Sequence, residues 1–460
     1  MSYSEKINSL KEELVSETQN LLKIKSVLSE EKPGMPFGEG IDNALKHALK
    51  LGEKLGFTTK YMDGYVGYIE WGSSSEMVGV LGHLDVVPEG DGWLYPPYGA
   101  EIHDGKIYAR GSLDDKGPIM AALYAMYSLK ESGYVPNKRI RIILGTNEET
   151  GSADMEYYKE HEEQPTIGFT PDADFPVIFG EKGLTVFNLV KKVEAGLEPI
   201  VYIKGGQRPN MVPDYCELAL KIQGIGECTK KIDSFNAENN ANIKYEIEND
   251  TLIIKSYGVS AHGSTPELGK NAIMQAIILL DHMNILKGDL KNSVEFLAKN
   301  IGMEYNGEGF GIKLHDEDSG YLTFNVGTIS TEGDTISLGL NLRYPVTFKL
   351  ENMMNPMEEK IKPLGFKIED FSHQEPLYFP RDHKLIRTLL DVYEKHTGDK
   401  AEPIAIGGGT YAKEMPNMVA FGPIFPGKPD LDHQANEYIE IEDLMKMTNI
   451  YASAIMELSK

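Results

Sequence analysis

The chain has 460 residues, of which 41% are hydrophobic and 25% are charged, as in a folded protein with one large or two ordinary domains. Its formal net charge of -24 argues against nucleic acid and anionic membranes as partners. Cys216 and Cys228 lie outside any Cys/His cluster, so the sequence specifies no disulfide framework, and we expect both to be buried and reduced.

The first residues of the chain lack the basic and apolar regions of a signal peptide. No apolar run approaches the length that a membrane-spanning helix needs. We therefore expect a cytoplasmic protein with no membrane partner.

Residues 1–183 are expected to form an α/β domain. Apolar residues at helical spacing between Ile7 and Leu22 predict an amphipathic helix, and a second helical stretch runs from Asp42 to Leu55. Strands and helices then alternate: the apolar run of Val78, Val80 and Leu81 as a strand, Ile119–Lys130 as a helix, Arg139–Leu144 as a strand, Ser152–Glu160 as a helix and Thr166–Phe169 as a strand. This alternation is typical of a central, mostly parallel sheet covered by helices.

From about residue 184 the pattern changes to longer strands in which apolar and polar residues alternate. These strands are Leu184–Val190, Tyr215–Ile222 and Thr335–Arg343. Antiparallel strands with one exposed face have this pattern, which predicts an inserted α+β domain over residues 184–376. The α/β style returns over residues 377–460, with a helix at Leu385–Val392, a strand at Met418–Phe421 and a final helix at Ile439–Leu458. We therefore expect a discontinuous first domain, made of residues 1–183 and 377–460.

The apolar run that begins at Met77 ends in His83-Leu84-Asp85. A histidine and a carboxylate two residues apart on a strand point to the same side. A metal can bind one imidazole nitrogen while a carboxylate orients the other. A single His-x-Asp is also common as a surface pair, so this pattern alone leaves both interpretations open.

Four further polar clusters lie where we expect a strand end or the loop after it, which is where open α/β sheets bind ligands. Asp114 and Asp115 precede a helix and could be ordinary capping residues, but one carboxylate can also bridge two cations. Glu148-Glu149 directly follows a buried strand, and two adjacent carboxylates there need a compensating cation. The remaining clusters are Thr170–Asp174 and Asp432–Glu437, either of which could be turn chemistry.

Taken together and in order, these motifs resemble a known family. They are similar to the metal-site motifs of the two-metal peptidases that include glutamate carboxypeptidase, aminoacylase and succinyl-diaminopimelate desuccinylase. The matching positions are His83-Leu84-Asp85, Arg110–Pro118, Glu148-Glu149, Asp172 and His433. The chain most resembles the PepV-type dipeptidase branch in its LDDKGP, PDA, EKG and HQ-x-NE forms. The resemblance covers essentially the whole chain, including the insertion, which in that family is a lid domain.

The resemblance implies two divalent metal ions, with Zn²⁺ expected first and Mn²⁺ or Co²⁺ as alternatives that such sites also accept. One ion would be held by His83, Asp114 and Asp172. The other would be held by Asp114, Glu149 and His433. Asp85 would then orient His83, and Glu148 would be the general base. Three carboxylates and two neutral imidazoles against two divalent ions leave about one positive charge for a bridging hydroxide.

The resemblance also assigns substrate-binding residues in the insertion. It gives Asn210, His262 and Arg343 to the substrate carbonyl and carboxylate. Without it, His262 would be an ordinary loop histidine. Arg343 ends the polar face of its strand, and its guanidinium matches a carboxylate in two-pronged fashion. A glycine turn, of which Gly408, Gly409 and Thr410 are candidate binding residues, would offer backbone amides beside that carboxylate.

The sequence thus predicts a metallopeptidase that hydrolyses dipeptides with a free C-terminal carboxylate. One alternative is an amidohydrolase of the same family that acts on N-acyl or N-succinyl amino acids, because the chemistry would be the same. Another is a catalytically silent metal-binding or peptide-binding protein, against which Glu148 beside Glu149 argues. The long insertion resembles an internal substitute for a partner subunit, so we expect a monomer.

Overall fold

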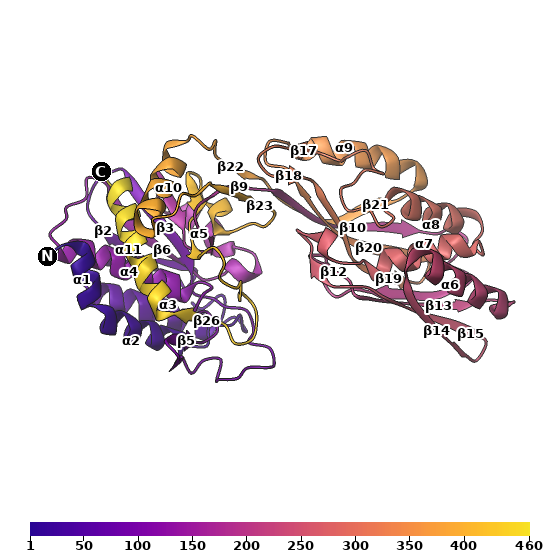
Figure 1. Cartoon of the computed structure of the whole chain (residues 1–460), viewed down its shortest axis with the longest axis horizontal. Coiled ribbons are helices and arrows are strands. Elements are labelled where there is room, and N and C mark those ends of the chain that lie inside the picture. The colour runs from indigo at the N-terminus through magenta and orange to yellow at the C-terminus, as the bar shows by residue number, and fades with distance from the viewer. The chain divides into compact units, whose positions relative to one another are not determined.

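A computed structural model describes all residues from Met1 to Lys460. The chain forms two compact units. Unit 1 consists of Met1–Phe179, Phe379–Ile404 and Gly409–Lys460, and unit 2 consists of Gly180–Tyr378 with Ala405–Gly408. The sequence of unit 2 therefore interrupts that of unit 1 (Figure 1).

Unit 1 is built on a sheet with the strand order β1-β2-β6-β3-β7-β24-β9-β22, whose last strand belongs to unit 2. Its strands are β1 (Thr58–Met62), β2 (Val66–Trp71), β3 (Met77–His83), β6 (Arg139–Gly145), β7 (Ile167–Thr170), β9 (Ile178–Glu181), β22 (Leu377–Tyr378), β24 (Met418–Ala420) and β23 (Ile404–Ile406), which pairs with β9. The neighbours β6, β3, β7 and β24 run parallel. Every residue of β3 is buried, which explains its continuous apolar run.

Helices cover this sheet, and residues from both ends of the chain contribute to them. The helices of unit 1 are α1 (Tyr3–Ser9), α2 (Lys11–Leu22), α3 (Glu39–Lys54), α4 (Lys116–Glu131), α5 (Ala153–His161), α10 (Lys384–Thr397) and α11 (Ile441–Leu458). The last helix packs on α4 and α1, so the yellow C-terminal helix lies among indigo and purple elements in Figure 1. The chain thereby joins its two terminal segments in one core.

The N-terminal amphipathic helix predicted from the sequence is two helices. Leu10 separates them, and its backbone N–H donates to the carbonyls of Lys6 and Ile7, which closes α1. Leu10 is also the N-cap of α2, and both helices contact α4. The apolar spacing continues across the break, so periodicity alone did not reveal it.

Short strands complete unit 1. A three-stranded sheet joins β4 (Glu101–His103), β5 (Lys106–Tyr108) and β26 (Tyr438–Glu440) in the order β26-β5-β4. Two more strands, β8 (Ala173–Asp174) and β25 (Pro423–Ile424), pair in parallel. These small sheets pair segments from the C-terminal quarter of the chain with segments from its first half.

Unit 2 contains an antiparallel sheet with the order β14-β15-β13-β11-β19-β20-β10-β21. Its strands are β10 (Gly183–Lys192), β11 (Ile200–Gly205), β13 (Tyr215–Lys221), β14 (Asn242–Glu248), β15 (Thr251–Tyr257), β19 (Thr323–Glu332), β20 (Thr335–Tyr344) and β21 (Lys367–Gln374). Its helices are α6 (Ile225–Asn239), α7 (Ala272–Met283), α8 (Gly288–Asn300) and α9 (Leu350–Ile361), and its short strand pairs are β12 (Met211–Val212) with β16 (Ala261–His262) and β17 (His315–Asp316) with β18 (Gly320–Tyr321).

The fold class predicted from the sequence is confirmed. A helix-covered sheet accompanies an inserted unit of antiparallel strands and helices. The sheet of unit 1 is mixed and not mostly parallel as expected: β6, β3, β7 and β24 are parallel neighbours, whereas β1-β2, β2-β6, β24-β9 and β9-β22 are antiparallel pairs. Both cysteines are buried and unpaired, as expected. None of the helices combines the length and the apolar composition that crossing a bilayer requires.

Candidate active site

His83 is the last residue of β3 and is fully buried. Its backbone N–H donates to Oδ2 of Asp115 over 3.2 Å. That approach needs the glycine at position 82, because a Cβ there would lie 2.2 Å from the same oxygen. The sequence did not distinguish the role of Asp115 from that of Asp114. In the structure Asp115 fixes the backbone of His83 by accepting its N–H.

The imidazole of His83 lies among three acidic residues. Nδ1 lies 2.9 Å from the backbone carbonyl oxygen of Asp85 and 3.4 Å from its carboxylate oxygen. Nε2 lies 2.9 Å from Oδ1 of Asp114 and 3.8 Å from Oδ1 of Asp172. The ring is thus oriented mainly by a backbone carbonyl, and its other nitrogen faces the two carboxylates.

Asp114 presents one oxygen to each of two imidazoles. Its Oδ1 faces His83, and its Oδ2 lies 3.1 Å from Nε2 of His433. The same nitrogen of His433 lies 3.1 Å from Oε2 of Glu149. Five candidate metal ligands, the fifth being Asp172, are therefore brought together in unit 1, with Asp114 between the two groups.

Topology explains this convergence. Glu149 follows β6, His83 ends β3 and Asp172 follows β7, and these three strands are parallel neighbours in the order β6-β3-β7. Their carboxyl ends meet at one edge of the sheet, where α/β folds bind ligands. Asp114 comes from the loop before α4, and His433 from the segment before β26.

The turn that carries Glu148 and Glu149 is held from two sides. The carboxylate of Asp85 accepts from the backbone N–H groups of both glutamates, each over 3.2 Å. The buried carboxylate of Asp154 accepts from the N–H groups of Thr146 and Asn147 over 2.6 and 3.0 Å. Asp85 therefore fixes the glutamate backbone as well as lying against His83.

Sequence reasoning missed Asp154 and its partner Tyr411, whose hydroxyl donates to the same carboxylate oxygen. Asp154 lies in the first turn of α5, where an acidic residue is ordinarily explained by the helix dipole. Its burial was the missing information, since a fully buried carboxylate needs several donors. No local pattern in the sequence indicates the contact with Tyr411.

The crowding of carboxyl groups changes their protonation. Burial raises the pKa of Glu148 well above its ordinary range, and the neighbouring charges of Asp172, Glu149 and Asp114 raise it further. Burial also raises the pKa values of Asp172 and Glu149, and Asp114 adds to both. Holding these groups ionised together therefore requires positive charge.

The raised pKa values of the two imidazoles also indicate an excess of negative charge at this site. Burial by itself lowers the pKa of His83, but its contacts with Asp114, Asp172 and Asp85 raise that pKa well above the ordinary value overall. Contacts with Asp114 and Glu149 raise the pKa of His433 to about 11. A cation bound between these carboxylates would replace the protons that the imidazoles otherwise hold.

The donor set fits divalent cations. Ligand atoms of His83, Asp114 and Glu149 all lie within 4.8 Å of one another. Imidazole nitrogen together with carboxylate oxygen suits zinc and neighbouring transition metals.

In unit 2, Arg343 lies near the end of β20 with 4% of its surface exposed. Its Nε donates to Oδ1 of Asn341 over 3.0 Å, and its Nη1 donates to the carbonyl oxygen of Gly407 over 2.6 Å. Both partners are neutral, and burial lowers the pKa of the guanidinium to about 10. An anion that reached this side chain would compensate its charge.

Asn210 and His262 lie on adjacent backbone segments of unit 2, and both are exposed. Met211 pairs with His262 across β12 and β16, and the N–H of Gly263 donates to the carbonyl oxygen of Asn210 over 2.7 Å. The N–H of Ser264 donates to Nδ1 of His262 over 3.3 Å. A neutral ring that accepts at Nδ1 carries its proton on Nε2.

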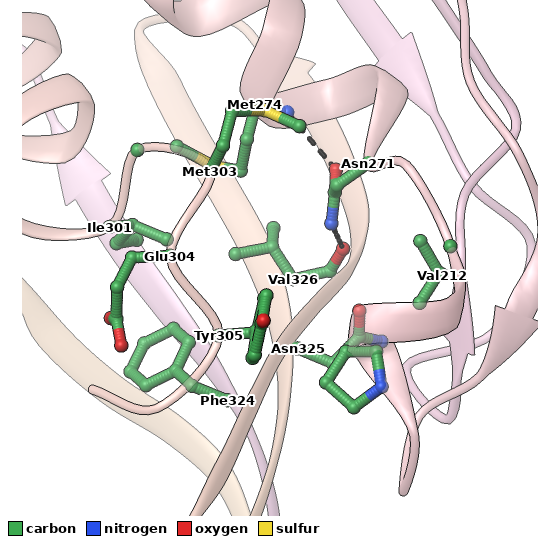
Figure 2. Close-up of a pocket in the computed structure, with 13 residues that line it drawn as sticks. Val212, Asn271, Met274, Ile301, Met303, Glu304, Tyr305, Phe324, Asn325 and Val326 are labelled. Atoms are coloured by element: carbon green, nitrogen blue, oxygen red, sulfur yellow. Dashed lines mark hydrogen bonds between the residues drawn. The ribbon is translucent and has the colours of Figure 1, made fainter. Parts of the chain in front are cut away.

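The loop that carries Asn210 rests on a buried amide. Nδ2 of Asn325, in β19, donates to the carbonyl oxygens of Pro209 and Met211, each over 2.8 Å. Asn325, Val212 and Val326 line a pocket of about 70 Å³. Figure 2 shows these three residues. Asn325 thus holds the backbone on both sides of Asn210.

The predicted glycine turn lies where the chain passes from one unit to the other. Gly408 is assigned to unit 2, while Gly409 and Thr410 belong to unit 1. The hydroxyl oxygen of Thr410 accepts from the N–H of Ala412 over 3.1 Å and caps a short helical turn. In unit 2 the turn faces Arg343 through the carbonyl of Gly407.

Two further histidines, His103 and His315, have aromatic neighbours. His103 stacks on Tyr95 with ring centroids 3.8 Å apart and contacts Glu101. His315 packs against Tyr321. Each has a local aromatic partner.

With the geometry described, comparison with known proteins identifies the class. Residues 79–457 match the model of peptidase family M20/M25/M40, and the chain belongs to that family. A relative from Bacillus subtilis (strain 168), named "Putative dipeptidase YtjP", is 42% identical and covers 100% of both chains. A relative from Staphylococcus epidermidis, named "Putative dipeptidase", is 37% identical over 99% of each chain. The chain is thus a metallopeptidase of family M20 with relatives named as dipeptidases.

Solved structures show the same fold at low sequence identity. Human carnosine dipeptidase 1 matches with a TM-score of 0.60 and 15% identity, over 99% of this chain and 98% of that one. The dipeptidase Dug1p from Saccharomyces cerevisiae matches with a TM-score of 0.59 and 15% identity, over 100% and 99%. At such identities the comparison concerns the fold, and the roles of individual residues stay predictions.

Proposed function

We propose that this chain is a dipeptidase that uses two divalent metal ions and cleaves dipeptides with a free C-terminal carboxylate. Unit 1 would be the catalytic part and unit 2 the lid. His83, Asp114 and Asp172 would hold one ion, and Asp114, Glu149 and His433 the other. The position of Asp114, with one oxygen toward each imidazole, supports a bridging role.

Two divalent ions, of which Zn²⁺ is our first choice and Mn²⁺ or Co²⁺ the alternatives, supply Lewis acidity that polarises a carbonyl and lowers the pKa of a water. The residues of the chain then have separate tasks. Glu148 takes a proton from the attacking water and passes it to the leaving amine.

In unit 2, His262 and Asn210 would contact the substrate carbonyl. A proton on Nε2 of His262, as the donor at Nδ1 favours, makes that nitrogen able to stabilise an oxyanion. Gly408, Gly409 and Thr410 would contribute polar groups beside the substrate carboxylate. Closure of the lid would exclude water from the reacting groups.

One observation carries the choice of substrate: Arg343 is a buried guanidinium whose two hydrogen-bond partners are neutral oxygens. A C-terminal carboxylate would pair with it in two-pronged geometry. Both a dipeptide and an N-acyl amino acid carry such a group, so the free N-terminus is the feature to vary.

The test is a matched substrate panel. Free dipeptides, the same dipeptides with amidated C-termini, and N-acetyl or N-succinyl derivatives of the same C-terminal residue would be compared with each metal added to stripped protein. We expect the free dipeptides to have the highest kcat/KM. Preferred hydrolysis of the N-acyl derivatives would identify an amidohydrolase, and metal binding without hydrolysis of any member would contradict the proposal.

A further inference from the structure

Glu437, directly before β26, has a fully buried carboxylate with several donors. Oε2 accepts from Nη1 of Arg110 over 2.7 Å and from the N–H of Gly111 over 3.1 Å. Oε1 accepts from the N–H groups of Leu113 and Asp114 over 2.7 and 3.2 Å. One side chain therefore binds three backbone amides of a single loop together with a buried arginine.

That loop delivers the bridging candidate Asp114. Gly111 has a φ of +84°, a conformation that glycine adopts without strain, and it turns its N–H toward Glu437. Successive amides that converge on one carboxylate oxygen form an anion-binding turn. The backbone of Asp114 is thus fixed by Glu437, while its side chain points to the two imidazoles.

Glu437 is also joined by four peptide bonds to His433, the other histidine of the centre. His433 and Asn436 have φ values of +63° and +65°, a conformation that is uncommon for residues other than glycine. The side chain of Asn436 accepts from the N–H of Leu94 over 2.6 Å and donates to the carbonyl of Gly92 over 3.2 Å. The segment is therefore anchored at its last two residues, just after the turn that presents His433.

We propose that Glu437 is a positioning residue of the metal centre: it fixes the Asp114 loop to the His433 segment, so that both ligands reach the same cation. This inference rests on the proposed metal sites. Glu437 itself binds no metal, because its carboxylate oxygens are occupied by the loop amides and Arg110. The cation that shares Asp114, Glu149 and His433 should depend on it most.

The test is a metal titration of chelator-stripped protein, followed by calorimetry and by the absorption of Co²⁺ as a probe. Glu437→Gln keeps the size of the side chain but turns an amide toward the loop donors. We expect the affinity for the second ion to fall about 10- to 100-fold, the usual effect of losing a group that orients ligands. At saturating metal, kcat should recover to within a few fold of wild type.

Two further variants control the interpretation. Glu440→Gln removes a carboxylate from β26 that pairs with Lys428, and it should leave both metal affinities unchanged. Glu437→Asp keeps the charge but shortens the reach to the loop amides. It should therefore also lower the affinity for the second ion. If Glu437→Gln does not fold, this variant tests the inference in its place.

The outcomes are separable. If Glu437→Gln lowers the unfolding temperature of stripped protein but binds both ions like wild type, Glu437 is merely structural and the inference fails. The same holds if neither Glu437 variant folds. If wild type itself fails to bind two ions, the proposed metal centre fails instead.

Discussion

The two units differ in the sign of the charge that their candidate residues bring together: it is negative in unit 1 and positive in unit 2. In unit 1, buried carboxylates crowd around two imidazoles, and their pKa values are displaced in the direction that a cation would correct. In unit 2, Arg343 is a buried cation whose hydrogen-bond partners are neutral. The contrast supports the proposal that unit 1 binds metal and that Arg343 in unit 2 binds the negatively charged end of a substrate.

The units also differ in how their candidate residues are held. In unit 1, His83, Glu149 and Asp172 end or follow neighbouring parallel strands, and buried groups such as Asp154 fix the backbone of the site. In unit 2, Asn210 and His262 lie exposed on short segments, and Asn325 supports the loop of Asn210 from within. We therefore expect substitutions of the candidate residues in unit 1 to affect metal binding or kcat. Substitutions of those in unit 2 should affect substrate contacts without loss of metal.

The largest expected effect comes from removing the metals. Chelator should abolish peptide hydrolysis while circular dichroism stays close to that of untreated protein, because this large core does not depend on metal to fold. Adding metal back should restore the rate. Full activity in protein shown by elemental analysis to be metal-free would contradict the proposal that unit 1 binds the metals needed for hydrolysis.

Next is Glu148→Gln, which should retain both ions yet lose about 10²- to 10⁴-fold in kcat, as loss of a general base does. The matched variant is Glu149→Gln, one residue along the same turn, which should lose metal. Measured metal content decides between them. Loss of metal in the first variant and retention in the second would mean that the two roles are exchanged.

In unit 2, Arg343→Ala should lower kcat/KM for a free dipeptide by ~30- to 1000-fold, since a charge-assisted and desolvated contact is lost. Arg343→Lys should recover part of this, because an ammonium lacks the planar fork. Metal content should not change.

The control for Arg343 is the substrate. Wild type should cleave a C-terminally amidated dipeptide poorly, and Arg343→Ala should make that rate little worse. Equal penalties on free and amidated substrates would show that Arg343 supports the structure of unit 2 instead of binding a carboxylate.

The smallest effect is expected from Asn325→Leu, which removes the two hydrogen bonds that hold the loop around Asn210. A small displacement of a substrate-contacting group should lower kcat/KM by about tenfold. Asn271→Ala is the matched control, because Asn271 lines the same pocket but donates to Val326 instead of to the loop (Figure 2). A similar loss of activity in both variants would point to a general weakening of unit 2.

Much of the fold followed from sequence because its signals are local. The apolar run of β3 and the alternation in β10 each correspond to the burial that the structure shows. The resemblance to the two-metal peptidases supplied the candidate ligands, and each of these lies at the end of a predicted strand, follows one or precedes a predicted helix. Arg343 was predicted to end the polar face of its strand, but its burial was not predicted: its Nε donates to the buried Asn341, and its Nη1 donates to the carbonyl oxygen of Gly407.

The supports of the site were harder to predict because they join distant positions. Tyr411 and Asp154 are 257 residues apart, and Glu437 lies 323 residues from Asp114. Burial converts an ordinary Asp or Glu into a residue that organises several backbone amides, and burial of a single polar side chain cannot be read from periodicity. The catalytic and ligand roles themselves stay predictions.

The place of β24 in the sheet has a consequence for synthesis of the protein. This strand lies between β7 and β9, yet it is encoded after the whole of unit 2. At roughly 5–20 residues per second, a ribosome needs on the order of ten seconds or more to go from β9 to β24. During that interval unit 2 can fold as a nearly continuous segment, while the edge of β7 stays unpaired. An unpaired strand edge can pair with other chains, so the risk of such pairing at β7 is greatest while the insertion is being translated.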